Sequence, residues 1–218
     1  MRIIARLAVV VALIGWAVYY RWLSPERQLQ PAADALKHVS SLRYAAVEQF
    51  LDRRNELRGD LVCSTPAVYD ARRNEAPGPD SPGGTLEDVF VGHLAYTRSS
   101  DGRWSNPAPA VAYGADETCR RIAVGAAVWF LPDYEKLLSQ GSIEKGSKKR
   151  VAGISCREWK IATERIPNEN EYTTICVRLD NNLPLEMTFR NQTFTYSDFN
   201  QPIEIEVPPS TTQTAATN

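Results

Sequence analysis

Residues 151–207 constrain the fold more than any other stretch, because they read as a series of short strands. Apolar and acidic residues alternate near the end of the stretch, in the sequence Ile203-Glu204-Ile205-Glu206-Val207. A period of two is typical of strands with one buried face and one wet face. Asn191-Gln192 and residues 167–170 supply residue types that favour turns. We therefore expect consecutive antiparallel strands joined by hairpins.

Composition limits the number of domains and the classes of partner. The chain has 218 residues, so we expect one domain over residues 31–209, followed by a disordered tail over residues 210–218. Lys and Arg together number 25 and Asp and Glu 26, which gives a formal net charge of −1. Nucleic-acid binding needs a clustered basic face, which this balance does not favour. No nucleic-acid partner is therefore expected.

The N-terminal segment, residues 1–23, has the composition of a membrane-directed segment. Leu7 to Tyr20 is an unbroken apolar and aromatic run, and the span from Ile3 to Leu23 can just cross about 30 Å of hydrocarbon at about 1.5 Å per residue. We expect an uncleaved transmembrane anchor through residues 3–23, followed by a polar linker over residues 24–30. The alternative is a signal peptide, cleaved after a pair of small residues, which would release a secreted domain.

Between the linker and residue 104 the sequence predicts a helix and further strands. Residues 31–39 read as a helix, with Pro acceptable in its first turn. Residues 42–51 and 57–69 read as a hairpin, because the first is rich in Tyr, Val and Phe and a polar turn separates them. Residues 85–98 read as one further strand, and residues 99–102 as the turn that returns the chain to Trp104.

Over residues 116–131 the apolar residues recur every three to four residues instead of every two, which predicts a helix. Asp116 can cap its first turn, and Ile122, Ala126 and Trp129 follow helical spacing. Almost nothing polar follows Arg121, so this helix must be buried, and we expect it inside the curve of the sheet. A second short helix is expected over residues 132–139.

The order of these elements and several short motifs resemble the LolA-like superfamily of envelope lipoprotein carriers. The matching residues lie between Ala33 and Pro209 and comprise Tyr96, Arg98, Asp101, Gly102 and Trp104; Gly153 and Cys156; Leu183-Pro184-Leu185; and Tyr196-Ser197-Asp198-Phe199-Asn200 with Pro202 and Pro208. The resemblance implies an α+β fold in which a strongly curved antiparallel sheet, an unclosed half-barrel, wraps a central apolar helix. It also implies a hydrophobic cavity, in which several members of the family hold acyl chains. The lipid-bearing Cys of the family's lipoprotein members is absent here.

We expect the ligand site between the sheet and the helix over residues 116–131. The candidate lining residues are apolar or aromatic: Phe90, Leu94 and Tyr96 from the sheet, and Val124, Val128, Trp129 and Phe130 from the helix. The function predicted is that of an extracytoplasmic, membrane-tethered domain that binds a lipid or another hydrophobic ligand. Two alternatives are open: a tightly filled core with no cavity, and a tethered protein-interaction or envelope-sensing domain without a ligand.

Motifs of the common enzyme classes are absent from the sequence. There is no Gly-x-Ser-x-Gly elbow, no His-Glu-x-x-His and no Gly-rich phosphate loop. Only two His occur, His38 and His93, and no two Cys lie close together as zinc ligands usually do. We therefore expect neither catalysis nor a cofactor or metal site.

Four Cys at low density predict two disulfides, as in an envelope or secreted protein. Cys156 and Cys176 flank the turn residues 167–170, so they would lie on the two arms of one hairpin, with an offset of about two residues. Cys63 and Cys119 are then left to each other. The pattern places the domain on the periplasmic or extracellular side of a membrane.

Overall fold

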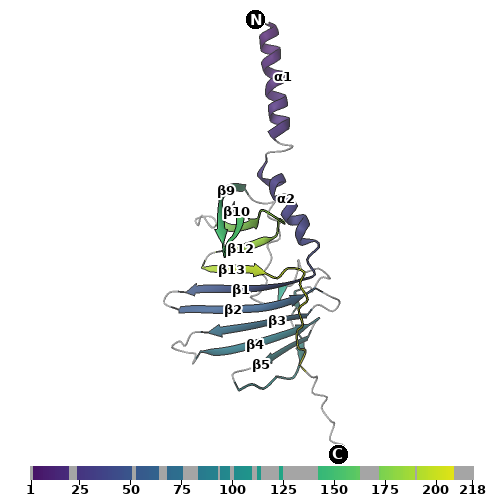
Figure 1. Cartoon of the computed structure of the whole chain (residues 1–218), viewed down its shortest axis with the longest axis vertical. Coiled ribbons are helices and arrows are strands. Elements are labelled where there is room, and N and C mark those ends of the chain that lie inside the picture. The colour runs from purple at the N-terminus through teal and green to yellow at the C-terminus, as the bar shows by residue number, and fades with distance from the viewer. Residues whose placement is uncertain are drawn as a thin grey trace, which may run out of the picture.

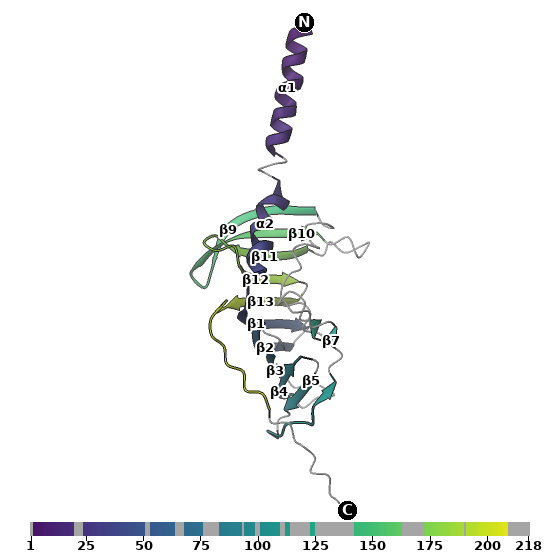
Figure 2. The same ribbon diagram turned by 90° about the vertical axis from the view of Figure 1, so that its right-hand side faces the viewer.

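The computed structural model describes residues 2–19, 24–50, 53–63, 68–75, 83–92, 94–98, 101–109, 112–113, 123–124, 142–162, 172–189 and 191–208. Within these residues the protein is a curved antiparallel sheet preceded in the chain by two helices (Figures 1 and 2). The helices are α1 (Arg2–Val18) and α2 (Pro25–Leu36). The strands are β1 (Ser41–Phe50), β2 (Arg53–Val62), β3 (Val68–Glu75), β4 (Gly84–Val91), β5 (Leu94–Arg98), β6 (Ala108–Pro109), β7 (Ala112–Tyr113), β8 (Ala123–Val124), β9 (Ser142–Val151), β10 (Ile154–Ala162), β11 (Tyr172–Arg178), β12 (Pro184–Phe189) and β13 (Gln192–Ser197).

Eleven of these strands form one sheet, in the order β6-β5-β4-β3-β2-β1-β13-β12-β11-β10-β9. Every neighbouring pair is antiparallel and is joined in sequence order, except that β1 pairs with β13 from the other end of the chain. In the part of the chain that the structure describes, β6 and β9 lie at the two edges, so the sheet is a partial ring. The α+β class and the curved antiparallel sheet predicted from sequence are confirmed.

Helix α2 begins earlier than the sequence predicted, because its start signal lies in the segment interpreted as a polar linker. The side chain of Ser24 accepts a hydrogen bond from the backbone N–H of Arg27, and Pro25 occupies the first turn, where it loses no helical hydrogen bond. The helix therefore runs from Pro25 to Leu36, with Pro31 inside it, and residues 24–30 are not a linker. Its buried residues follow three-to-four spacing and are Leu29, Ala32, Ala33 and Leu36.

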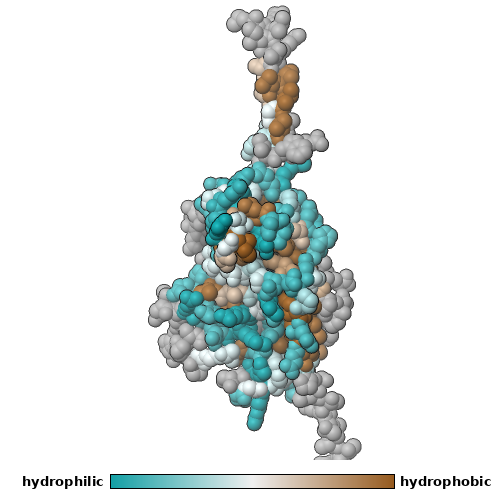
Figure 3. Space-filling view, in the orientation of Figure 1, coloured by the Kyte–Doolittle hydropathy of each residue, from teal (hydrophilic) through white to brown (hydrophobic). Residues whose placement is uncertain are grey.

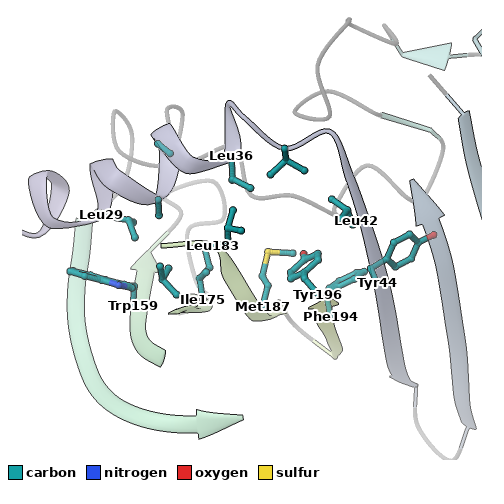
Figure 4. Packing of buried hydrophobic residues seen from close by; sticks show 14 of the residues in the cluster. Leu29, Leu36, Leu42, Tyr44, Trp159, Ile175, Leu183, Met187, Phe194 and Tyr196 are labelled. Atoms are coloured by element: carbon teal, nitrogen blue, oxygen red, sulfur yellow. The ribbon is translucent and has the colours of Figure 1, made fainter. Parts of the chain in front are cut away.

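The main hydrophobic core lies between α2 and one face of the sheet, which we call the helix face. In Figure 4, Leu29 and Leu36 of α2 lie over Trp159, Ile175 and Met187 of the sheet. The core continues through Phe194 and Tyr196 of β13 into β1, where Leu42, Tyr44 and Ala46 are buried. Because successive strand residues point to opposite faces, Arg43, Ala45 and Val47 of β1 lie on the other side, which we call the outer face.

The first hairpin is confirmed, but its turn is shorter than predicted. Strands β1 and β2 pair without interruption from Ser41↔Val62 to Phe50↔Arg53. Arg53 to Glu56, predicted to be a polar turn, therefore belongs to β2, and the predicted strand over 57–69 is divided between β2 and β3.

The single strand predicted over residues 85–98 is in fact a hairpin. Gly92 has φ 60°, a conformation that glycine adopts without steric cost, and it separates β4 from β5. Phe90 pairs with Ala95 and Val89 pairs with Tyr96. Phe90 therefore lies on the helix face, opposite Tyr69, whereas Tyr96 lies on the outer face.

The C-terminal strand run is confirmed as far as β13, and the strand predicted over residues 203–207 is wrong. Asp198 and Asn200 have positive φ, and they turn the chain away from the sheet. The side chain of Asn200 accepts a hydrogen bond from the Ser40 N–H at 2.7 Å, and its own N–H donates to the Ser41 carbonyl at 2.9 Å. Residues 201–208 then leave β13 as an extended segment outside any described strand (Figure 2). The turn predicted at Asn191-Gln192 is one residue late, because Gln192 already pairs with Phe189.

The predicted central helix is wrong where the structure can test it. Ala123 and Val124 form β8, which pairs with β7 over Ala112 and Tyr113. The rest of residues 116–131, and the helix predicted over 132–139, lie outside the described residues.

The predicted Cys156–Cys176 disulfide is confirmed, with 5.5 Å between the Cα atoms. In the register of β10 and β11, Cys156 is opposite Arg178 and Cys176 is opposite Glu158, so the two Cys are diagonal neighbours. Cys63 is also disulfide-bonded. Its predicted partner, Cys119, lies outside the described residues, so that pairing stays a prediction.

Helix α1 projects from the domain and carries uncovered apolar side chains. Val9, Val11, Leu13 and Ile14 are between 58% and 62% exposed. In Figure 3 the part of this helix that is drawn in colour is mostly hydrophobic, whereas the domain surface below it is a mixture with more hydrophilic than hydrophobic residues. No helix among the described residues has the length and apolar character needed to cross a membrane.

Candidate functional site

The residues predicted to line one cavity are not brought together. Phe90 lies on the helix face, whereas Leu94 and Tyr96 lie on the outer face, because β5 pairs Leu94 with Val91 and Tyr96 with Val89. Val124 belongs to β8. Val128, Trp129 and Phe130 lie outside the described residues.

On the helix face, three aromatic rings cross the strands from β1 to β4. Tyr44 and Tyr69 are stacked, with ring centroids 6.0 Å apart and planes inclined by 7°. Their hydroxyl groups are hydrogen-bonded to each other. The ring of Phe90 continues the row, 5.5 Å from that of Tyr69. Burial is the main cause that raises the pKa of both Tyr44 and Tyr69, so both phenols stay neutral.

A glycine in β2 makes room for this row. Gly59 lies opposite Tyr44 on β1, and the phenol of Tyr44 lies across it. A Cβ atom at this position would overlap the Tyr44 ring and would lie 2.5 Å from the Asp70 carbonyl oxygen. The absence of a side chain at Gly59 therefore permits the contact between Tyr44 and Tyr69.

The helix face is not fully buried at this end of the sheet. Leu57 of β2 and Phe90 of β4 pack against the core while remaining partly accessible. Both residues are on the same face as Tyr44 and Tyr69, by strand register. The core thus ends at the partly accessible side chains of Leu57 and Phe90, with the buried ring of Tyr69 beneath them, and we call these three residues the aromatic end.

The outer face of β2, β3 and β4 is charged and contains a groove of about 460 Å³. The residues that line the groove are Glu56, Arg58, Gly59, Asp60, Asp70, Arg72, Arg73, Asn74 and Thr85. The sequence analysis missed this site. The sequence feature that corresponds to the groove is a reversed order of charges: Arg58-Gly59-Asp60 runs from basic to acidic, and Asp70-Ala71-Arg72 runs from acidic to basic. Antiparallel pairing of the two segments therefore places like charge opposite like charge.

An ion-pair chain runs from the groove toward β5. Arg72 donates to Asp70 Oδ2 at 3.1 Å and to Glu87 Oε1 at 3.0 Å, and Glu87 also pairs with Arg98. The guanidinium of Arg98 lies 4.9 Å from the ring centroid of Trp104, with which it shares an isolated bridge. The sequence predicted the turn that returns the chain to Trp104. The contacts between Arg98 and Trp104 give these two motif residues a structural role at that turn.

Asp70 is the most unusual group in the groove. It is 8% exposed, and its Oδ1 atom is buried without a hydrogen-bond partner among the described residues. Burial is the largest cause that raises the pKa of Asp70; Glu87 and Asp60 raise it further and Arg72 opposes them. Among the described residues, no group of His, Cys, Asp and Glu could hold a metal ion.

This raised pKa predicts how stability depends on pH. A carboxyl group whose pKa is higher in the folded protein than in the unfolded chain binds protons preferentially in the folded state, so its charged form destabilises the fold at neutral pH. We expect wild type to gain stability relative to Asp70→Asn as pH falls from 7 through the pKa of Asp70, measured by urea unfolding.

Asp180→Asn is the control of opposite sign. The hydrogen bond from Arg178 is the main cause that lowers the pKa of Asp180, so wild type should lose stability relative to this variant as pH falls. If the difference in free energy of unfolding between wild type and Asp70→Asn does not change with pH, the prediction is contradicted.

Comparison with known proteins gives matches in structure and none in sequence. No model of a known protein family matches the chain, and no curated protein sequence matches it. The structure of LprF from Mycobacterium bovis is similar with a TM-score of 0.62 at 13% identity, over 84% of this chain and 96% of that chain. Lipoprotein LppX from Mycobacterium tuberculosis is similar with a TM-score of 0.58 at 13% identity, over 84% of this chain and 98% of that chain. The chain therefore has the fold of these two proteins, and the LolA-like fold predicted from its sequence is confirmed.

Proposed function

We propose that the protein is an extracytoplasmic domain that binds a lipid or another hydrophobic ligand at the aromatic end of its helix face. The observation that carries the proposal is the core that ends in partly accessible apolar residues, Leu57 and Phe90, instead of a closed polar surface. Apolar pockets are the usual sites for such ligands, because burying apolar surface drives their binding. The LolA-like fold shared with LprF and LppX supports the same function.

Two further features support the location. The Cys156–Cys176 disulfide is typical of an oxidising compartment such as the periplasm or the cell exterior. The exposed apolar side chains of α1 would be covered if the N-terminal segment lay in a membrane, and we propose that it tethers the domain there. The function proposed is therefore that of a membrane-tethered, lipid-binding envelope domain.

Lipid extraction tests this function. We expect the full chain to fractionate with membranes and, after purification in a mild detergent, to release about one lipid per protein into organic solvent, as measured by mass spectrometry. Leu57→Glu and Phe90→Glu should each remove most of this lipid, because a carboxylate at the aromatic end opposes an apolar ligand. Thr195→Glu, at an exposed position on the outer face of β13, is the matched control and should keep the lipid.

Circular dichroism and thermal melting of each variant separate loss of lipid from loss of fold. A folded wild-type protein with no bound lipid would overturn the proposal and would favour a protein-interaction domain.

A further inference from the structure

The outer face of β2 and β3 holds two cross-strand pairs of like charge next to each other. Arg58 is opposite Arg72, and Asp60 is opposite Asp70. Like charges directly opposite each other destabilise a sheet. The two pairs are two residues apart along each strand, or about 7 Å. A row of two cations therefore lies beside a row of two carboxylates, an arrangement that packing alone does not require.

Neighbouring side chains neutralise these rows only in part. Arg43 donates to Asp60 at 3.1 Å, and Arg72 is shared between Asp70 and Glu87. Arg58 has no hydrogen-bond or ion-pair partner in the described part of the chain. Asp70 Oδ1 is also without a partner there, although Asp70 is more than nine-tenths buried. One exposed guanidinium and one buried carboxylate oxygen, from adjacent rows, are thus left without a partner among the described residues.

Both groups line the outer-face groove, whose volume of about 460 Å³ is in the range of small-molecule sites. A simple anion in the groove would pair with Arg58 but would be repelled by Asp60 and Asp70. A simple cation would pair with Asp70 but would be repelled by Arg58 and Arg72. A ligand that carries both charges, separated by a short spacer, satisfies both rows.

We propose that the outer-face groove binds a phosphoethanolamine group, with the phosphate against Arg58 and Arg72 and the ammonium against Asp70 and Asp60. Guanidinium groups bind phosphate in a forked geometry, and a primary ammonium provides the N–H donor that Asp70 Oδ1 lacks. An α-amino acid carries its charges on a single carbon, too close together to reach both rows. The groove is on the face opposite the aromatic end, so this site is independent of the proposed function.

Calorimetric titration of the full chain in detergent with O-phosphoethanolamine tests the proposal. We expect saturable binding of one molecule per protein. Asp70→Asn and Arg58→Gln should each weaken it by about tenfold or more, as expected for loss of one charge-assisted hydrogen bond. Ethanolamine alone and inorganic phosphate alone should bind at least about tenfold more weakly, because each meets one repulsive row. Arg178→Gln, which removes an exposed ion pair with Asp180, is the control and should leave affinity unchanged.

Short-chain phosphatidylethanolamine identifies the source of the group. If it binds more tightly than O-phosphoethanolamine, and Asp70→Asn removes that affinity, the ligand is a lipid headgroup; if it binds no more tightly, the ligand is the free compound. Short-chain phosphatidylcholine, whose quaternary ammonium has no N–H donor, should bind weakly in both cases. Circular dichroism confirms that the variants are folded. Absence of O-phosphoethanolamine binding at millimolar concentration, or equal binding by folded Asp70→Asn, would overturn the proposal.

Discussion

Gly59→Ala is expected to lower the free energy of unfolding by about 3 kcal/mol, the upper part of the usual range for overpacking. The added Cβ would overlap the phenol of Tyr44 and meet the carbonyl oxygen of Asp70, which is backbone and cannot rotate away. Displacing Tyr44 would also break its hydrogen bond to Tyr69 and leave two buried hydroxyl groups without that partner. Urea unfolding followed by circular dichroism measures the change.

A double-mutant cycle identifies the cause. Tyr44→Leu removes the ring that the new Cβ would meet but leaves the contact with the Asp70 carbonyl oxygen. Gly59→Ala should therefore cost less in that background, by a coupling of about 1 kcal/mol or more, while the remaining cost comes from the backbone contact. Gly146→Ala is the graded control, because its Cβ would lie 3.0 Å from the Glu158 carbonyl oxygen, which is a milder contact. Equal costs for the two glycine substitutions would show that the Tyr44 contact is not responsible.

Cys156→Ala with Cys176→Ala is expected to destabilise the protein by about 3 kcal/mol. The bond joins residues 20 apart, and closing such a loop removes that much conformational entropy from the unfolded chain. Both Cys are buried apart from the main core, in a small cluster with Leu185 against which Val151 and Ile154 pack. A melting temperature lower by about 6–12 °C is expected for a domain of this size.

Alanine is used because serine would bury a new hydroxyl group at each position. The measured loss of stability then reports on the crosslink and its packing. Cys156→Ser with Cys176→Ser should therefore be less stable than the alanine pair. If the alanine pair loses less than about 1 kcal/mol, the bridge does not limit the stability of this hairpin.

The sequence predicted the strands well because alternation is a local signal. Residues of β10 to β13 were predicted from alternation and turn residues, and the first hairpin from a segment rich in Tyr, Val and Phe beside a polar turn. Alternation alone was not sufficient, because residues 203–207 alternate without forming a strand. The faces were harder to predict, because they depend on where each hairpin turns. Treating residues 85–98 as one strand placed Phe90 and Tyr96 on one side, whereas the turn at Gly92 places them on opposite sides.

The charged groove could not be predicted from single segments. Arg58-Gly59-Asp60 looks like an ordinary solvated strand, and its like-charge pairing with residues 70–72 appears only once the register of β2 and β3 is known. The start of α2 was missed for a different reason. Pro31 was interpreted as a first-turn residue, and the stronger signal, Ser24 followed by Pro25, came earlier.

The pairing of β1 with β13 has a consequence for the order in which the protein assembles. The ladder joins Arg43 to Ser197 and Glu48 to Gln192, so the middle of the sheet is made from the two ends of the domain sequence. The hairpins on either side join residues close in sequence and form quickly. The β1–β13 ladder forms only when the last strand is present, and its formation has the entropic cost of closing a loop that spans the domain. A chain that emerges N-terminus first from a ribosome or a translocation pore cannot complete its core until β13 has emerged. Until then the strand that carries Leu42, Tyr44 and Ala46 lacks its neighbour, and Phe194 and Tyr196 are missing from the core around them. A chaperone that holds the nascent domain would find its apolar binding site there.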